Sequence, residues 1–240
     1  MAAASRGVFV RGNKGGRIRY GGICLGIVLA LSVLTGGCGK KPGAEMDGGR
    51  FEGSVYHNDY LGLTVTLPPE WSVQDRELTK QTSRTGGQML AGGSESMQTT
   101  LKEGEQRTIP LFNVFKFLPG SPVPDNPYIY ACAENMSAYP GIQTGGDYLF
   151  HARRVLEAGQ FKFSFPREVY VETLAGVPFH VMTTELVIPP AGKMMQEYFA
   201  TVRKGYALVF TLSYWTPEER TELRNALNTM TLTPLPQAKK

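Results

Sequence analysis

Alternating apolar and polar positions mark the first regular element of this chain. In LGLTVTL, residues 61–67, every second side chain is apolar. A two-residue period predicts a strand with one buried face. Pro68 and Pro69 end this strand because proline cannot donate to a sheet ladder, and Trp71 is expected to fill the core beside it.

Later segments are dense in β-branched and aromatic residues, which favour strands. They cover residues 111–117, 128–134, 168–174, 177–188, 194–203 and 206–215. Lys204 and Gly205 separate the last two segments and predict a tight hairpin turn. A run of six or seven strands is therefore expected.

Helical periodicity appears in three places. Residues 75–104 are polar with scattered apolar anchors, and their two glycine pairs predict either two short helices or a helix and a loop. Residues 144–159 begin with a capping pair, Thr144 and Asp147, and end at Gly159. Residues 216–230 begin with Thr216 as the cap and predict the terminal helix. This order indicates an α+β fold, with a mostly antiparallel β-sheet packed against helices.

Two stretches of this pattern resemble the PsbP-like superfamily. They are NDYLGLTV leading to LPPEW near residue 71, and the hairpin with GYALVFTLSY before the terminal helix. The superfamily includes photosystem II extrinsic PsbP, Ran-binding Mog proteins and DcrB-type lipoproteins. The resemblance covers about residues 55–232 and implies a non-enzymatic binding or accessory role. It supplies no shared catalytic residues, and the long segment 75–104 departs from the smaller members.

The beginning of the chain has the layout of a secretory signal. Residues 1–20 carry only positive charge, and GGICLGIVLALSVLTGG, residues 21–37, carries none. LTGGC, residues 34–38, resembles the lipobox of bacterial lipoproteins, although Thr35 stands where that motif usually has a large aliphatic residue. The resemblance implies that Cys38 is acylated and becomes the mature N-terminus. An uncleaved signal anchor, or a chance cysteine in an ordinary signal peptide, are the alternatives.

These patterns divide the chain into four parts. Residues 1–37 are the expected signal peptide, and residues 38–54 are the expected flexible, lipid-anchored tether, because they are rich in glycine and charge. Residues 55–234 form the expected PsbP-like domain, and residues 235–240 a disordered tail. The expected location is the bacterial cell envelope, with the domain on the extracytoplasmic side of a membrane.

Charge and cysteine content exclude two classes of protein. Five of the 25 basic residues precede the apolar run, which leaves 20 basic against 21 acidic residues from Cys38 onward. This balance argues against nucleic-acid binding, which needs a concentrated basic surface. Three cysteines cannot form a disulfide framework, and Cys132, within YIYACA, is expected to be a small buried side chain.

No catalytic or metal-binding motif occurs in the sequence, and no cofactor is predicted. His57, His151 and His180 belong to different predicted elements, so each is interpreted as an ordinary histidine. An enzyme whose site combines dispersed histidines and carboxylates is one alternative. A small-ligand-binding protein is another, suggested by aromatic residues at 128, 130, 161, 163, 165, 198 and 214.

The candidate functional feature is a proline-rich connection, residues 118–127. Its stiffness would reduce the entropy lost when a partner binds. The predicted partner-binding surface consists of Pro119, Pro122, Pro124, Pro127 and Tyr128. A stiff strand connection without a binding role explains the same residues. Residues 139–142 would extend the surface if the fold brings the two loops together. We expect a binding or assembly factor whose partners are the membrane, through Cys38, and another envelope protein.

Overall fold

The computed structural model describes residues 46–188 and 192–235. These residues form four helices and twelve strands, and every strand pair is antiparallel. The predicted α+β class with an antiparallel sheet is confirmed. The number of strands is larger than expected because five short strands were not predicted. Three of them, at 50–52, 55–58 and 231–232, belong to a second sheet, and two, at 72–73 and 163–164, belong to the large sheet.

The large sheet has eight strands. In spatial order its main path is β4 (Ser72–Val73), β5 (Thr108–Phe115), β6 (Tyr128–Asn135), β11 (Tyr206–Tyr214), β10 (Gly192–Arg203), β9 (Val177–Ile188) and β7 (Phe163–Ser164). β8 (Tyr170–Leu174) pairs with the other end of β9. β11 is central and buried at every residue.

The small sheet joins the two ends of the domain. It contains β1 (Arg50–Glu52), β2 (Val55–Asn58), β3 (Leu63–Thr66) and β12 (Thr231–Leu232). Met46 is only 3% exposed, and β1 pairs with β2. The predicted boundary at residue 55 is therefore wrong: residues 46–54, assigned from their glycine content to the tether, belong to the folded domain.

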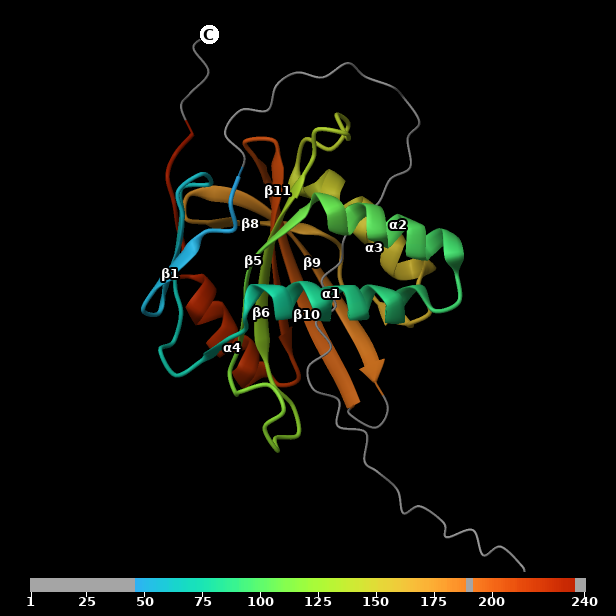
Figure 1. Cartoon of the computed structure of the whole chain (residues 1–240), viewed down its shortest axis with the longest axis horizontal. Coiled ribbons are helices and arrows are strands. Elements are labelled where there is room, and N and C mark those ends of the chain that lie inside the picture. The colour runs from blue at the N-terminus through green and yellow to red at the C-terminus, as the bar shows by residue number, and fades with distance from the viewer. Residues whose placement is uncertain (1–45, 189–191, 236–240) are drawn as a thin grey trace, which may run out of the picture.

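Helices cover both faces of the large sheet (Figure 1). α1 (Arg76–Ala91), α2 (Glu95–Arg107) and α3 (Gly145–Ala158) lie on one face, whereas α4 (Pro217–Leu227) and the small sheet lie on the other. Each side has its own hydrophobic core. Trp71 belongs to the core on the α4 side, as its sequence context predicts.

Local signals in the sequence fix the ends of several elements. Thr144 caps α3 and Thr216 caps α4, and both helices have complete capping boxes. Lys204 and Gly205 both have positive φ, 50° and 80°, in the tight turn between β10 and β11. The segment 75–104 contains two helices, which is the first of the two arrangements predicted.

Candidate functional site

The main candidate site is a cleft between α1 and α2. Asp75 caps α1 by accepting hydrogen bonds from two backbone N–H groups, and Gly92, with φ 55°, ends the helix. Ser94 caps α2 immediately afterwards. This short turn makes the two helices neighbours that run side by side across the sheet (Figure 1).

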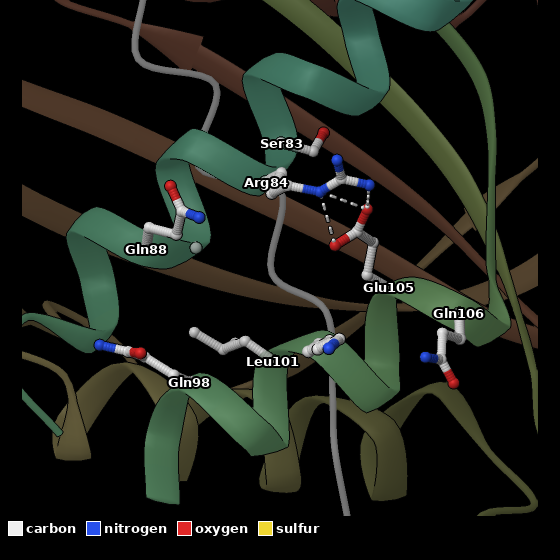
Figure 2. A pocket seen from close by; sticks show the side chains of 9 residues that line it. Ser83, Arg84, Gln88, Gln98, Leu101, Glu105 and Gln106 are labelled. Atoms are coloured by element: carbon white, nitrogen blue, oxygen red, sulfur yellow. Dashed lines mark hydrogen bonds and ion pairs between the residues drawn. The ribbon is translucent and has the colours of Figure 1, made fainter. Parts of the chain in front are cut away.

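The cleft has a volume of about 570 Å³, which lies within the range of ligand-binding sites. Its lining comes from both helices, and seven of its nine residues have polar or charged side chains: Ser83, Arg84, Gly87, Gln88, Gln98, Leu101, Lys102, Glu105 and Gln106. Figure 2 shows Gln88 on α1 opposite Gln98 on α2 at one end of the cleft. The arrangement offers hydrogen-bond donors and acceptors from both walls.

An ion pair connects the two walls. Arg84 Nε donates to both Glu105 carboxylate oxygens, at 2.9 and 3.2 Å, and Arg84 Nη2 donates to Oε1 at 2.5 Å (Figure 2). The hydrogen bonds that Arg84 donates to Glu105 raise the pKa of Arg84. This geometry is bidentate, the form in which arginine fixes the position of a carboxylate. It holds α1 and α2 at a defined separation.

The large sheet carries buried polar side chains on the side covered by α1, α2 and α3. Tyr198 donates to Gln196 Oε1 at 2.5 Å, and Gln196 Nε2 donates to Ser213 at 2.9 Å. All three side chains are buried, and burial raises the pKa of Tyr198. Asn113 on β5 donates to Gln74, just before α1. The sequence does not reveal these two groups of hydrogen bonds, because their members are distributed over four segments.

A second buried cluster lies at the other end of β6. Tyr148 of α3 donates to Glu134 Oε2 at 3.1 Å, and the Arg107 guanidinium lies 4.0 Å from Oε1. Cys132 is buried beside it, and burial, together with the Glu134 charge, raises the pKa of its thiol to about 12. The interpretation of Cys132 as a buried structural residue is confirmed.

The proline-rich connection only partly forms the predicted surface. Pro119, Pro122 and Pro124 are exposed. Pro127 and Tyr128 are buried because β6 begins there and its first side chains enter the core. These two residues cannot contact a partner, so their inclusion was wrong.

Two exposed apolar residues lie at the beginning of the proline-rich connection. Phe117 and Leu118 are 38% and 69% exposed. An open groove of about 650 Å³ borders Trp71, Phe117 and α4. Lys116 crosses it to Glu222, with 2.6 Å between Nζ and Oε2. Phe117, which borders this groove, immediately precedes the proline-rich connection.

Residues 139–142 do not join the proline-rich connection. They follow the end of β6, whereas residues 118–127 precede its beginning. Tyr139 and Ile142 are buried in the core beneath α3, and the Arg107 guanidinium lies 4.9 Å from the Tyr139 ring centre. The expectation of a joint surface is therefore wrong.

The three histidines remain apart. His57 lies near Thr64, 3.3 Å from its hydroxyl, and the His151 ring contacts Phe150. His180 packs beneath the glycine pair that begins α3. Within residues 46–188 and 192–235, no three His, Cys, Asp or Glu side chains are grouped as metal ligands would be. The aromatic residues proposed for small-ligand binding are core residues at 128, 130, 198 and 214, and half-buried at 161, 163 and 165.

The predicted signal peptide and Cys38 lie outside the described residues. None of the described helices is long and apolar enough to cross a membrane. The acylation of Cys38 stays a prediction from the sequence.

Comparisons with known proteins found similar solved structures. No protein-family model and no curated protein matches the sequence. Cyanobacterial PsbP (CyanoP) from Synechocystis sp. PCC 6803 is 10% identical, with 82% of this chain and 98% of that chain covered and a TM-score of 0.46. LpqN, involved in cell envelope biogenesis of Mycobacterium tuberculosis, is 16% identical, with 72% and 83% covered and a TM-score of 0.37. PA94, a Pseudomonas aeruginosa protein of unknown function, is 18% identical, with 54% and 83% covered and a TM-score of 0.37.

Proposed function

We propose that this protein is a lipid-anchored accessory factor of the bacterial cell envelope, which binds another envelope protein through the cleft between α1 and α2. The signal layout that ends at Cys38 supports the anchor. The cleft supports the binding role, because two helices contribute facing polar side chains to one groove of suitable volume. This cleft is the observation that carries the proposal.

The chemistry of the cleft favours recognition over reaction. Its carboxylate, Glu105, already accepts three hydrogen bonds from Arg84. A carboxylate fixed in this way fits a structural and orienting role better than that of a general base, which has to accept a proton from a substrate. The glutamine amides on both walls provide donors and acceptors without changing charge.

Metabolic labelling with a fatty acid tests the anchor. The wild-type chain and a Cys24→Ser control are expected to incorporate label, and Cys38→Ser to lose it and leave the membrane fraction. Equal labelling of Cys38→Ser and the wild type would exclude Cys38 as the acylation site.

A photo-cross-linking residue tests the binding role. We expect the residue to give one discrete adduct in intact cells when it replaces Gln98 in the cleft. It should give none when it replaces Lys162, which is exposed beyond α3. The same adduct from both positions, or none from Gln98, would contradict a partner at the cleft.

A further inference from the structure

We infer that the cleft between α1 and α2 binds an extended peptide segment that carries a carboxylate side chain, supplied by the partner protein. This inference rests on the proposed function, which makes the cleft a binding site, and adds the chemical class of what it binds. Three features of the cleft carry it: an open position at Gly87, an unpartnered hydroxyl on Ser83, and an excess of positive charge.

Gly87 keeps part of the cleft open. Glycine inside a helix costs about 1 kcal/mol relative to alanine. A Cβ at Gly87 would meet only the Leu101 side chain, at 3.8 and 3.9 Å, which is ordinary contact. Packing therefore does not require glycine here. The missing side chain leaves space above Leu101, which is the apolar floor of the cleft.

Ser83 presents a hydroxyl that the protein does not satisfy. The residue lines the cleft and is only 7% exposed. Its Oγ has no hydrogen-bond partner among the described residues. A buried hydroxyl without a partner costs about 1–3 kcal/mol. A ligand that brings a donor or acceptor to this wall would remove that cost.

The charges of the lining favour an anionic group. Arg84 and Glu105 neutralise one another. Lys102, one turn of α2 before Gln106, is exposed and forms no ion pair with any residue that the structure describes. The cleft therefore carries one net positive charge, and a carboxylate on the ligand would pair with the Lys102 ammonium.

The remaining lining distinguishes a peptide from other anions. Gln88, Gln98 and Gln106 each offer an amide donor and an amide acceptor, as a peptide backbone does. Gln98 Nε2 already donates one hydrogen bond to the Gly92 carbonyl, at 3.0 Å, and has a second N–H. A small inorganic ion would use neither the acceptors nor the volume of about 570 Å³. None of the nine lining residues is aromatic, so the cleft has no ring on which a sugar or a base would stack.

Fluorescence anisotropy on the full chain in detergent tests this inference. The probe is a labelled octapeptide library with two fixed glutamates and the other positions mixed, and its control has glutamine at the fixed positions. We expect saturable binding of the glutamate library and about tenfold weaker binding of the glutamine library, equivalent to one charge-assisted hydrogen bond. Equal binding of the two libraries, or no saturable binding, would overturn the inference.

Variants locate the binding to the cleft. Gly87→Leu fills the open position and should abolish binding of the glutamate library, whereas Gly87→Ala should weaken it while raising the melting temperature. Lys102→Gln should weaken binding about tenfold. Lys80→Gln, which removes a lysine paired with Glu77 outside the cleft, should have no effect. Unchanged binding in Gly87→Leu would show that the library binds outside the cleft. Complete displacement of the library by inorganic phosphate or by anionic phospholipid vesicles would show that the ligand is a phosphate group and not a peptide.

Competition in the cross-linking experiment separates this inference from the proposed function. An adduct at Gln98 that the glutamate library does not displace would reject the acidic peptide and leave the accessory role intact. Binding of the library without any adduct in cells would support the affinity of the cleft for an acidic peptide and reject the proposed partner protein at the cleft.

Discussion

Four phenylalanine rings, Phe112, Phe179, Phe199 and Phe210, lie in the core on one face of the large sheet, whereas the core on the other face combines aliphatic side chains with five tyrosines and borders the buried Gln196. The first face is covered by α4 and the small sheet, and the second by α1, α2 and α3. Burial of apolar rings contributes more stability per residue than a buried polar network does. We therefore expect the α4 side to contribute the larger share of the stability, and the cleft proposed for recognition lies on the other side.

Removing a ring from the apolar face should have the largest effect on stability. Phe210 is fully buried, and its ring centre lies 6.1 Å from that of Phe179 and 6.3 Å from that of Phe112. Phe210→Ala should lower the free energy of unfolding by about 4 kcal/mol. Urea denaturation followed by circular dichroism measures this loss. If a single substitution in α1 or α2 lowers the free energy of unfolding more than Phe210→Ala does, the α4 side is not the main source of stability.

The next effect concerns the ion pairs on the α4 side. Arg224 donates to Glu197 Oε2 at 2.7 Å and to Glu172 at 2.6 Å, while Glu197 is only 2% exposed. Burial alone would lower the pKa of Arg224, but the hydrogen bonds that it donates to both carboxylates outweigh burial and raise that pKa. Arg224→Met should destabilise by about 3 kcal/mol, because Glu197 loses one of its two partners.

The double variant Arg224→Met with Glu197→Met is the control for this prediction. It should recover most of the loss, because the buried charge is removed together with its partner. A double variant as unstable as Arg224→Met alone would show that packing of the arginine stem is responsible.

On the α1–α2 side, removing a polar group should increase the stability of the fold. Ser83→Ala deletes the hydroxyl without a partner and places a better helix former in α1. The free energy of unfolding should rise by about 1 kcal/mol. A thermal melt of the full chain measures it, and a fall in melting temperature would show that this hydroxyl is bonded in solution.

The smallest effect is the contribution of Asp147, at the beginning of α3, to the pH dependence of stability in acid. Hydrogen bonds from the Thr144 hydroxyl, and from the backbone N–H groups of Thr144 and Gln143, lower the pKa of Asp147. The carboxylate therefore contributes stability above its ordinary pKa of about 3.8, and that contribution is lost as the pH falls through the lower, folded-state value. Asp147→Asn should make stability between pH 5 and pH 3 slightly less dependent on pH. An unchanged slope would contradict the role of this cap.

Elements fixed by neighbouring residues could be predicted from the sequence. The caps at Thr144 and Thr216 and the turn at Lys204 depend on interactions within a few residues, so the pattern contains them. The glycine pair at Gly86 and Gly87 argued against a continuous helix. α1 nevertheless passes through it, because contacts with the sheet and with α2 stabilise the helix beyond its intrinsic propensity.

The cleft could not be predicted, because its residues resemble an ordinary solvated helix face. Gln88 and Gln98 come from separate helices, and only the turn after Gly92 places them opposite one another. Met46 was missed for a similar reason. It is a single apolar residue among glycines and charges, and its burial depends on packing in the core that contains Tyr56.

The burial of Met46 also limits how far the domain can stand from a bilayer. Eight Cα-to-Cα steps separate residues 38 and 46, and a fully extended chain of that length spans at most about 29 Å. An attachment point at residue 55 would have allowed about 60 Å. With the acyl group on Cys38 as proposed, the point where the chain enters the domain can reach any position within a half-sphere around the anchor. The radius of this half-sphere is about half of what an attachment at residue 55 would allow. The local concentration of the domain near membrane-bound neighbours then rises about eightfold, since volume scales with the cube of the radius.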